Sequence, residues 1–120
     1  MSYNISAFNI KKIEDLKIPL LDAIRTLKDV SIKLTGENIT ISAELVKSFD
    51  CSGHLDNNNI ITITEIDFGG EGSGNSWELL IKMLKKTTGK LSAIVVWEGG
   101  DSLGKLSVVN GVITETEVDL

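Results

Sequence analysis

The sequence predicts one α+β domain, in which two main helices pack on a twisted, mainly antiparallel sheet of about six to seven strands. Three observations support this prediction. Apolar and polar residues alternate in most segments, two segments instead have helical spacing, and short turns join consecutive strands. Strands joined by tight turns must pair antiparallel. The 120 residues, of which 42% are hydrophobic, correspond to a single domain spanning residues 1–120.

The chain begins with a predicted strand, which is followed by a helix. Residues 3–8 favour a strand, and residues 11–16 favour a separate helical turn. Pro19 fits the first turn of a helix over residues 19–28, where its missing N–H breaks no hydrogen bond. Apolar residues at steps of three and four mark the buried side of this region: Ile13, Leu16, Leu20, Ile24 and Leu27.

A hairpin and a further strand follow. Apolar residues alternate with polar ones over residues 30–45, with a turn at residues 35–38, and the alternation continues through Phe49. Residues 60–68 form the next predicted strand. The apolar positions of this strand change phase midway, which predicts a β-bulge near residues 64–65.

The second half of the chain contains the clearest helix, over residues 76–88, and we expect Gly89 to end it. The apolar residues 90–98 predict a buried, central strand. A hairpin around Asn110 and Gly111 follows, because this dipeptide is typical of two-residue turns between antiparallel strands.

The stretch DFGGEGSGNSW, residues 67–77, holds four of the chain's eleven glycines. A dinucleotide-binding fingerprint starting at Gly70 fails, because Asn75 stands where the third glycine belongs. The Gly-Lys-Ser/Thr of a phosphate-binding P-loop is also missing, and the acids around the helix start would repel a phosphate. The glycines either form a strand-to-helix corner that needs positive φ or present bare backbone to a partner. Both interpretations stay open.

Acids near the glycines could attract a cation. Four carboxylates lie in loops that start where strands 60–68 and 90–98 end: Asp67, Glu71, Glu98 and Asp101. They would share one rim if the two strands were parallel neighbours, joined by a crossover through the helix between them. Hard cations such as Ca²⁺ or Mg²⁺ take oxygen ligands of this kind, but the spacing matches no EF-hand. We keep this cation site as an alternative and assign no metal and no cofactor.

The single cysteine, Cys51, lies three residues before the single histidine, His54. This spacing suggests a thiolate–imidazole pair or half of a zinc site, but no other residue pattern supports either. We therefore expect a buried cysteine and a histidine in a turn, with no catalytic residues and no enzymatic activity. One cysteine allows no internal disulfide, and we recognise neither a signal peptide nor a membrane-spanning stretch. We expect a cytoplasmic protein.

The net charge of −5 is distributed unevenly along the chain. Residues 1–48 carry 7 basic and 6 acidic side chains, whereas residues 49–120 carry 5 basic and 11 acidic ones. Because Lys and Arg are not clustered, we expect no binding to nucleic acid, and the acidic part should attract a basic protein surface. Tryptophan is a frequent interface anchor. The predicted partner contacts are seven acids and one tryptophan of this region: Glu65, Asp67, Glu71, Trp77, Glu98, Asp101, Glu115 and Glu117.

A small, acidic α+β chain without a catalytic signature resembles the immunity proteins that bacteria make against their own toxins. The resemblance implies a non-enzymatic inhibitor that blocks the active site of a cognate toxin, such as a basic nuclease, with an acidic surface. Two other classes stay open. A secretion-type chaperone or adaptor would hold an extended client strand on an exposed apolar surface or sheet edge. A small-ligand or cation-binding domain would have a deep pocket between Gly70 and Gly100.

Overall fold

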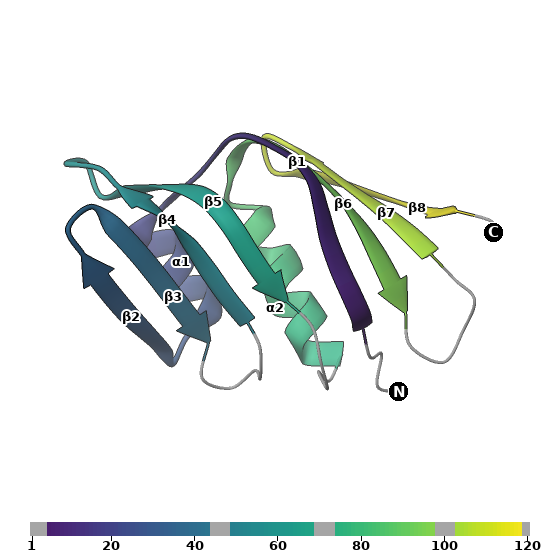
Figure 1. The fold of residues 1–120 in the computed structure, drawn as a ribbon, viewed down its shortest axis with the longest axis horizontal. Coiled ribbons are helices and arrows are strands. Elements are labelled where there is room, and N and C mark those ends of the chain that lie inside the picture. The colour runs from purple at the N-terminus through teal and green to yellow at the C-terminus, as the bar shows by residue number, and fades with distance from the viewer. Residues whose placement is uncertain (1–4, 44–48, 69–73, 98–102, 119–120) are drawn as a thin grey trace.

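A computed structural model of the protein describes residues 5–43, 49–68, 74–97 and 103–118. Its elements, in chain order, are β1 (Ile5–Pro19), α1 (Leu20–Leu27), β2 (Val30–Thr35), β3 (Asn38–Ala43), β4 (Phe49–Leu55), β5 (Ile60–Phe68), α2 (Gly74–Leu84), β6 (Thr88–Trp97), β7 (Leu103–Val109) and β8 (Val112–Val118). The strands form one antiparallel sheet in the order β2-β3-β4-β5-β1-β6-β7-β8, and both helices lie on the same side of it (Figure 1). The predicted α+β class is confirmed, but the described residues form a sheet of eight strands and not six or seven.

β4 accounts for the additional strand. The sequence predicts one strand that continues through Phe49 and places His54 in a turn, whereas β3 ends at Ala43 and β4 begins at Phe49 and includes His54. Buried Phe49, Cys51 and Gly53 alternate along β4 with more exposed polar residues. Glycine is depleted in strands, and the small side chains on this side of β4 weaken the apolar signal of its period-2 pattern.

β1 is a single strand of 15 residues, so the helical turn predicted for residues 11–16 is wrong. The pairing of β1 with β6 is irregular at two places within residues 10–17. Each irregularity changes the side of the sheet that the following residue faces, so apolar residues recur at intervals that imitate a helix. The helix α1 begins directly after Pro19, close to the start that the sequence predicts.

β1 lies in the middle of the sheet, between β5 and β6 (Figure 1). β5 and β6 both pair antiparallel with β1, so they run in the same direction without being neighbours. The parallel-neighbour arrangement on which the cation alternative depended is therefore wrong.

β1 and β5 diverge from each other along most of their length. They pair through Lys17, Ile18 and Pro19 of β1, whereas β1 pairs with β6 almost throughout. The N-terminal part of β1 and the C-terminal part of β5 separate, and α2 lies behind the opening (Figure 1). We call the interval between residues 63–68 of β5 and residues 5–14 of β1 the split.

Two hairpin turns have the positions and residues that the sequence predicts. Gly36, with a φ of 62°, and Glu37 connect β2 to β3. Asn110 and Gly111, with φ of 47° and 80°, connect β7 to β8. Positive φ at both Asn110 and Gly111 makes this second turn type I′, which matches the twist of the strands on either side.

α2 ends earlier than the sequence predicts, at Leu84. Thr87 is buried, and its hydroxyl donates a hydrogen bond to the Leu84 carbonyl oxygen at 2.6 Å, which satisfies a carbonyl group at the helix end. The chain then enters β6 at Thr88, so Gly89 belongs to a strand and does not end the helix. Two consecutive β-branched residues favour the extended conformation at this point.

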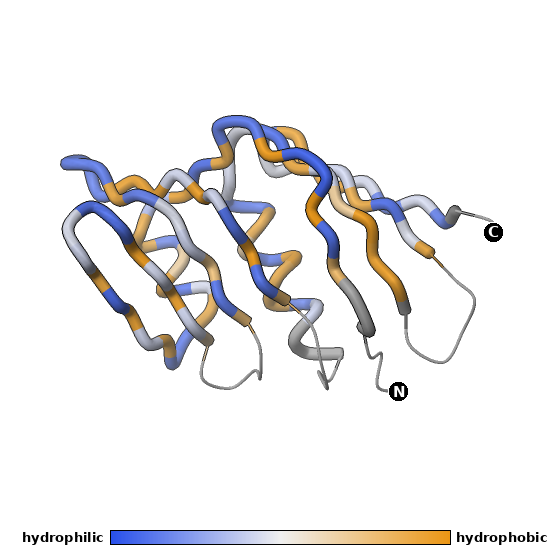
Figure 2. Tube along the Cα trace, viewed as in Figure 1, coloured by the Kyte–Doolittle hydropathy of each residue, from blue (hydrophilic) through white to orange (hydrophobic). Residues whose placement is uncertain are grey.

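The core lies between the sheet and the two helices, which also contact each other. Figure 2 shows hydrophobic and hydrophilic residues alternating along β3, β4 and β5, as expected for antiparallel strands with one buried side. Among the described residues, β2 and β8 contribute no buried hydrophobic side chain. Neither of the two described helices, with 8 and 11 residues, has the length and apolar character needed to cross a membrane.

Candidate functional site

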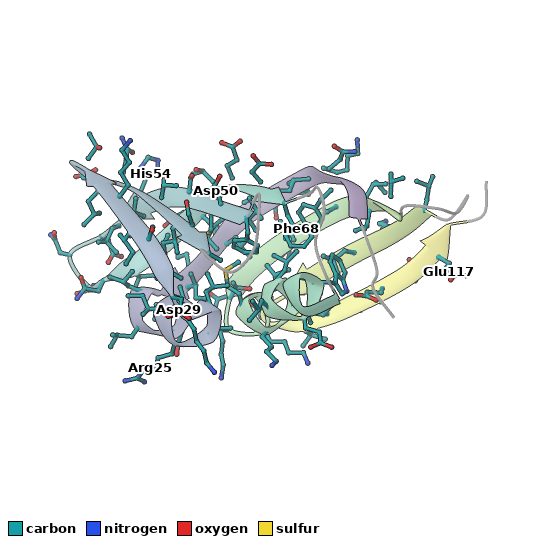
Figure 3. All side chains as sticks on the ribbon, turned by 90° about the horizontal axis from the view of Figure 1, so that it is seen from below. Arg25, Asp29, Asp50, His54, Phe68 and Glu117 are labelled. Carbon is teal, nitrogen blue, oxygen red and sulfur yellow. The ribbon has the colours of Figure 1, made fainter. Side chains whose placement is uncertain are left out.

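Three carboxylates gather on the side of the sheet that faces away from the helices. Phe49 is buried on β4, so the next residue, Asp50, points to the opposite side (Figure 3). On β5, Phe68 is buried, whereas Glu65 and Asp67 are exposed. We call Asp50, Glu65 and Asp67 the carboxylate face.

The pairing of β4 with β5 brings the negative charges of the carboxylate face close together. Asp50 lies directly opposite Asp67, and Ser52 lies directly opposite Glu65. Directly opposite side chains in an antiparallel pair have Cβ atoms about 4.5–5.5 Å apart, so two carboxylates in these positions repel each other. The Ser42 hydroxyl donates a hydrogen bond to Asp50 Oδ1. Within the described ranges, none of the three carboxylates takes part in an ion pair.

Small hydroxyl side chains surround the carboxylate face. Thr40 Oγ1 and Ser52 Oγ lie 3.2 Å apart, and the Thr64 hydroxyl donates to the Ser52 carbonyl oxygen at 3.3 Å. His54 lies on the same side of the sheet (Figure 3), and Lys33 of β2 lies opposite Thr40 at its margin. The result is a polar sheet surface of mostly small side chains, which the surface of another protein can contact over several strands.

A β-bulge changes which residues in the second half of β5 face the helices. Ile63 pairs with Gly53, and the next paired residue of β5 is Glu65, so Thr64 is the extra residue and the predicted bulge is confirmed. Because of this extra residue, the polar side chains that follow point away from the helices. Gly53 is required next to the bulge, since a Cβ at this position would lie 2.0 Å from the Thr62 carbonyl oxygen.

Aromatic rings pack at the split on the helix side of the sheet. Phe68 lies edge-to-face against Phe8 and Trp77, with ring-centroid distances of 6.0 and 6.2 Å. Phe49 packs on Phe68 at 5.7 Å, and Phe8 and Trp77 are 6.5 Å apart. The Trp77 ring is thus partly buried in this cluster, beneath the strand whose opposite side carries Asp67.

Glu115 and Glu117 do not belong to the carboxylate face. Glu115 lies opposite the buried Leu106, and Glu117 lies opposite Gly104, so both glutamates are on the side of the sheet that carries the helices. Figure 3 shows Glu117 near the right-hand end of the molecule, away from Asp50. Three further predicted contacts lie outside the described residues: Glu71, Glu98 and Asp101.

Asp50 is a member of the carboxylate face that was not predicted from the sequence. A signal for it exists, because Phe49, Cys51 and Leu55 occupy alternate positions and place Asp50 on the polar side of a strand. The assignment of His54 to a turn conceals this signal. Glu65 and Asp67 are the two predicted contacts that the structure brings together.

Cys51 and His54 do not form a catalytic pair or half of a zinc site, because they lie on opposite sides of β4. Cys51 is buried, as the sequence predicts, and burial raises the pKa of its thiol to about 12, so the thiol is protonated at neutral pH. Across the described segments, no group of three or more His, Cys, Asp or Glu side chains is placed to hold a metal ion. Of the carboxylates in the cation alternative, Asp67 is the one that lies in a described segment.

The carboxylate face offers charge attraction and hydrogen bonding over several neighbouring strands. The backbone that carries these acids and the surrounding hydroxyl residues is held in a paired sheet before any partner binds. Comparisons of the chain with protein-family models, with curated proteins and with solved structures find no match.

Proposed function

We propose that this protein is a non-enzymatic binding module whose carboxylate face holds a protein partner with a basic surface. The observation that supports the proposal is the direct opposition of Asp50 and Asp67 on the exposed side of the sheet. Like charges in directly opposite positions lower the stability of the free protein. A Lys or Arg side chain of a partner, placed between the two carboxylates, would remove this repulsion and form charge-assisted hydrogen bonds with both.

The surroundings of the two aspartates suit a protein surface as the ligand. The neighbouring side chains Thr40, Ser42 and Ser52 carry hydroxyls that can donate or accept hydrogen bonds at the rim of an interface. The local negative charge would also raise the association rate of a basic partner, and this contribution would decrease with added salt.

A bacterial immunity protein is the class that we propose for this module. It would act in the cytoplasm and cover the active site of a cognate toxin, with a basic nuclease domain as the partner that best complements the carboxylates. Glu71, Glu98 and Asp101 remain proposed contacts, because β5 and β6 run in the same direction and the three acids follow the ends of these strands. Glu115 and Glu117 would need a partner that reaches around the sheet, so we place them outside the main contact.

Charge reversal on the carboxylate face tests the proposal. The immobilised wild-type chain should retain a basic protein from a lysate of the native host, and Asp67→Lys should weaken this binding by roughly tenfold or more. Glu78→Lys is the matched control, because it reverses an exposed charge on α2, on the other side of the sheet. Equal retention by wild type, Asp67→Lys and Glu78→Lys would reject the carboxylate face as the binding surface.

The inhibitor class is tested separately with the purified partner. In a one-to-one mixture with the wild-type chain, the partner should lose its activity, for example cleavage of nucleic acid. The Asp67→Lys variant should restore that activity at the same concentration. A basic partner that binds but stays fully active would support the binding module and reject the inhibitor.

A secretion-type chaperone is a second candidate, and one observation favours it. The edge strand β2 carries Ile32 and Leu34, which are 41% and 56% exposed, and an extended client strand could pair with this edge. A client peptide that binds wild type and fails to bind Ile32→Lys, with unchanged affinity for Asp67→Lys, would favour the chaperone over the immunity protein.

A further inference from the structure

We infer that two copies of this chain pair antiparallel through their β2 edges and form one continuous sheet. The inference goes beyond the proposed function and does not depend on it. It concerns the side of the molecule on which β2 ends the sheet, whereas the carboxylate face is built on β4 and β5.

The two edges of the sheet differ in how they are protected. On β8, Glu115 and Glu117 stand on the helix side, and charged side chains that point inward at an edge oppose pairing with another strand. On β2, the positions on the helix side hold Ile32 and Leu34. These two side chains are apolar, so no charge on the helix side of β2 opposes pairing. They are also 41% and 56% exposed and therefore open to a further strand.

The apolar side chains of β2 extend the layer of core residues to the exposed edge of the sheet. Ile32 lies opposite Ile41, and Leu34 lies opposite Ile39, and the two β3 residues are 1% exposed. A strand added at the β2 edge would place its own inward side chains next to Ile32 and Leu34. Apolar side chains there would extend the same layer and remove exposed hydrophobic surface from water.

The backbone of β2 is oriented for this pairing. In a hairpin with a two-residue turn, the pair that closes the turn exchanges backbone hydrogen bonds, and every second pair does so from there. Thr35 and Asn38 close the turn between β2 and β3. The N–H and C=O groups of the three apolar residues, Val30, Ile32 and Leu34, are therefore directed to the free edge.

The register centred on Ile32 gives a second copy the most apolar pairs with its backbone groups matched. With Ile32 opposite Ile32 of the other copy, each Val30 faces a Leu34, and all three apolar positions of β2 form hydrogen-bonded pairs. A shift by one residue would turn the apolar side chains of one copy to the polar side of the other. A shift by two residues toward the turn would place Lys33 opposite Lys33, and like charges in that position are unfavourable. A shift by two residues away from the turn would pair Leu34 with Lys28 instead of Val30 and lose an apolar pair.

Charge in the favoured register supports a second copy as the occupant. Lys33 is the single charged residue of β2, and in this register it faces Ser31 of the other copy. Asp29 immediately precedes β2, two residues before Ser31, so it would be the diagonal neighbour of Lys33, at about 7–8 Å and within reach of a long side chain. The twofold symmetry repeats this opposite-charge contact at both ends of the interface.

Such a dimer would occupy the edge that a chaperone client needs. Because the strands join in one sheet, the carboxylate faces of the two copies would lie on the same side. The pairing would thus exclude a client strand at β2 and leave both carboxylate faces open to a basic partner.

The oligomeric state of the full chain tests this inference. Light scattering after size-exclusion chromatography, over a series of concentrations, should give twice the mass of the chain. Ile32→Lys should raise the dimer dissociation constant by roughly tenfold or more, because two like charges would face each other at the centre of the interface. Val112→Lys is the matched control on the other edge, where Val112 is 68% exposed, and it should remain a dimer. A monomeric wild type, or a dimer that Ile32→Lys leaves intact, would overturn the inference.

A cysteine scan tests the register independently of affinity. Cα atoms of a hydrogen-bonded antiparallel pair are about 5.5 Å apart, within the range that a disulfide bridges. Ile32→Cys should therefore give a disulfide-linked dimer under mild oxidation, whereas Ser31→Cys and Lys33→Cys should not. Cys51 can stay in place, because it is 2% exposed. Cross-linking at residue 31 or 33 instead of residue 32 would reject the register, and no cross-linking at any of the three would reject the pairing.

Discussion

Asp50 and Asp67 are directly opposite each other across β4 and β5, on the side of the sheet that faces away from the helices. The Ser42 hydroxyl bonds to Asp50, but no ion pair within the described segments compensates either charge. The arrangement holds two like charges together in the free protein and keeps them available to a basic partner.

Removal of one charge from this pair should stabilise the free protein. We expect Asp67→Asn to raise the free energy of unfolding by about 0.2–1 kcal/mol, because the like-charge repulsion is lost. The gain should shrink at high ionic strength. Urea denaturation at low and high salt measures both effects. Glu117→Gln, at an exposed carboxylate opposite Gly104, is the control and should change stability less. A destabilised Asp67→Asn would show that Asp50 and Asp67 do not repel each other in solution.

The Cys51 thiol should react only when the protein unfolds. Burial raises its pKa to about 12, so the reactive thiolate is nearly absent in the folded protein at pH 8, and reagents cannot reach the sulfur. Labelling with a chromogenic disulfide reagent should therefore be slow in buffer and fast in concentrated urea. Fast labelling of the folded chain at pH 8 would place Cys51 outside the core.

The same thiol predicts how stability changes at alkaline pH. Above the ordinary cysteine value of 9.0 the unfolded chain loses the thiol proton, while the folded chain keeps it up to about pH 12. The unfolded state then binds fewer protons, so the free energy of unfolding falls as the pH rises from about 9 toward 12, and below pH 9 the thiol contributes its full stabilisation. Cys51→Val should have a weaker decline in stability over this interval. Urea denaturation of both proteins at pH 8 and pH 10 checks the difference.

Gly53 should tolerate no side chain. We expect Gly53→Ala to lower the free energy of unfolding by about 1–3 kcal/mol, because the added Cβ would overlap the Thr62 carbonyl oxygen next to the bulge. Gly36→Ala is an instructive comparison. No atom lies within 4 Å of a Cβ at Gly36, so strain from its positive φ of 62° is the sole expected penalty there. If Gly53→Ala proved as stable as wild type, the close contact between β4 and β5 would be wrong.

Phe68 should be the most sensitive residue of the aromatic cluster, because its ring contacts Phe8, Phe49 and Trp77. We expect Phe68→Ala to lower the free energy of unfolding by about 3–5 kcal/mol. Phe8→Ala should cost less, since Phe8 is only partly buried. Equal effects of the two substitutions in urea denaturation would contradict a central position for Phe68. Near-ultraviolet circular dichroism would show whether the remaining rings keep their packing.

The parts of the fold that could be predicted from sequence are those in which one or two residues decide the local backbone. The Asn110 and Gly111 turn is of this kind, because few residue pairs accept two positive φ angles. The bulge at Thr64 also belongs here, since a regular strand cannot place Ile63 and Ile66 on the same side of the sheet. In both cases the chemistry of a short segment excludes the alternatives.

The parts that could not be predicted depend on distant contacts. The spacing of Ile13 and Leu16 is helical, but β6 imposes irregular strand pairing on this segment. Gly53 would be a poor residue for an ordinary strand, but here it makes the close contact between β4 and β5. The same limits apply to the candidate site. Glu65 and Asp67 could be placed from the pattern of their own strand. Asp50 could not, because its place depends on the existence of β4 and on its pairing with β5.

The central position of β1 has a consequence for how the chain is made. The partners of β1 in the sheet begin only at Ile60 and Thr88, so β1 must remain unpaired on both sides until β5 leaves the ribosome, and on one side until β6 does. Contacts between such distant segments form slowly, and an unpaired apolar strand is prone to aggregation during this time. The meander from β2 to β5 can assemble earlier, but it is joined to β1 by a short stretch of pairing. Completion of the molecule therefore waits for β6, and a nascent chain stalled before Thr88 would expose β1 to the chaperones that bind extended hydrophobic segments.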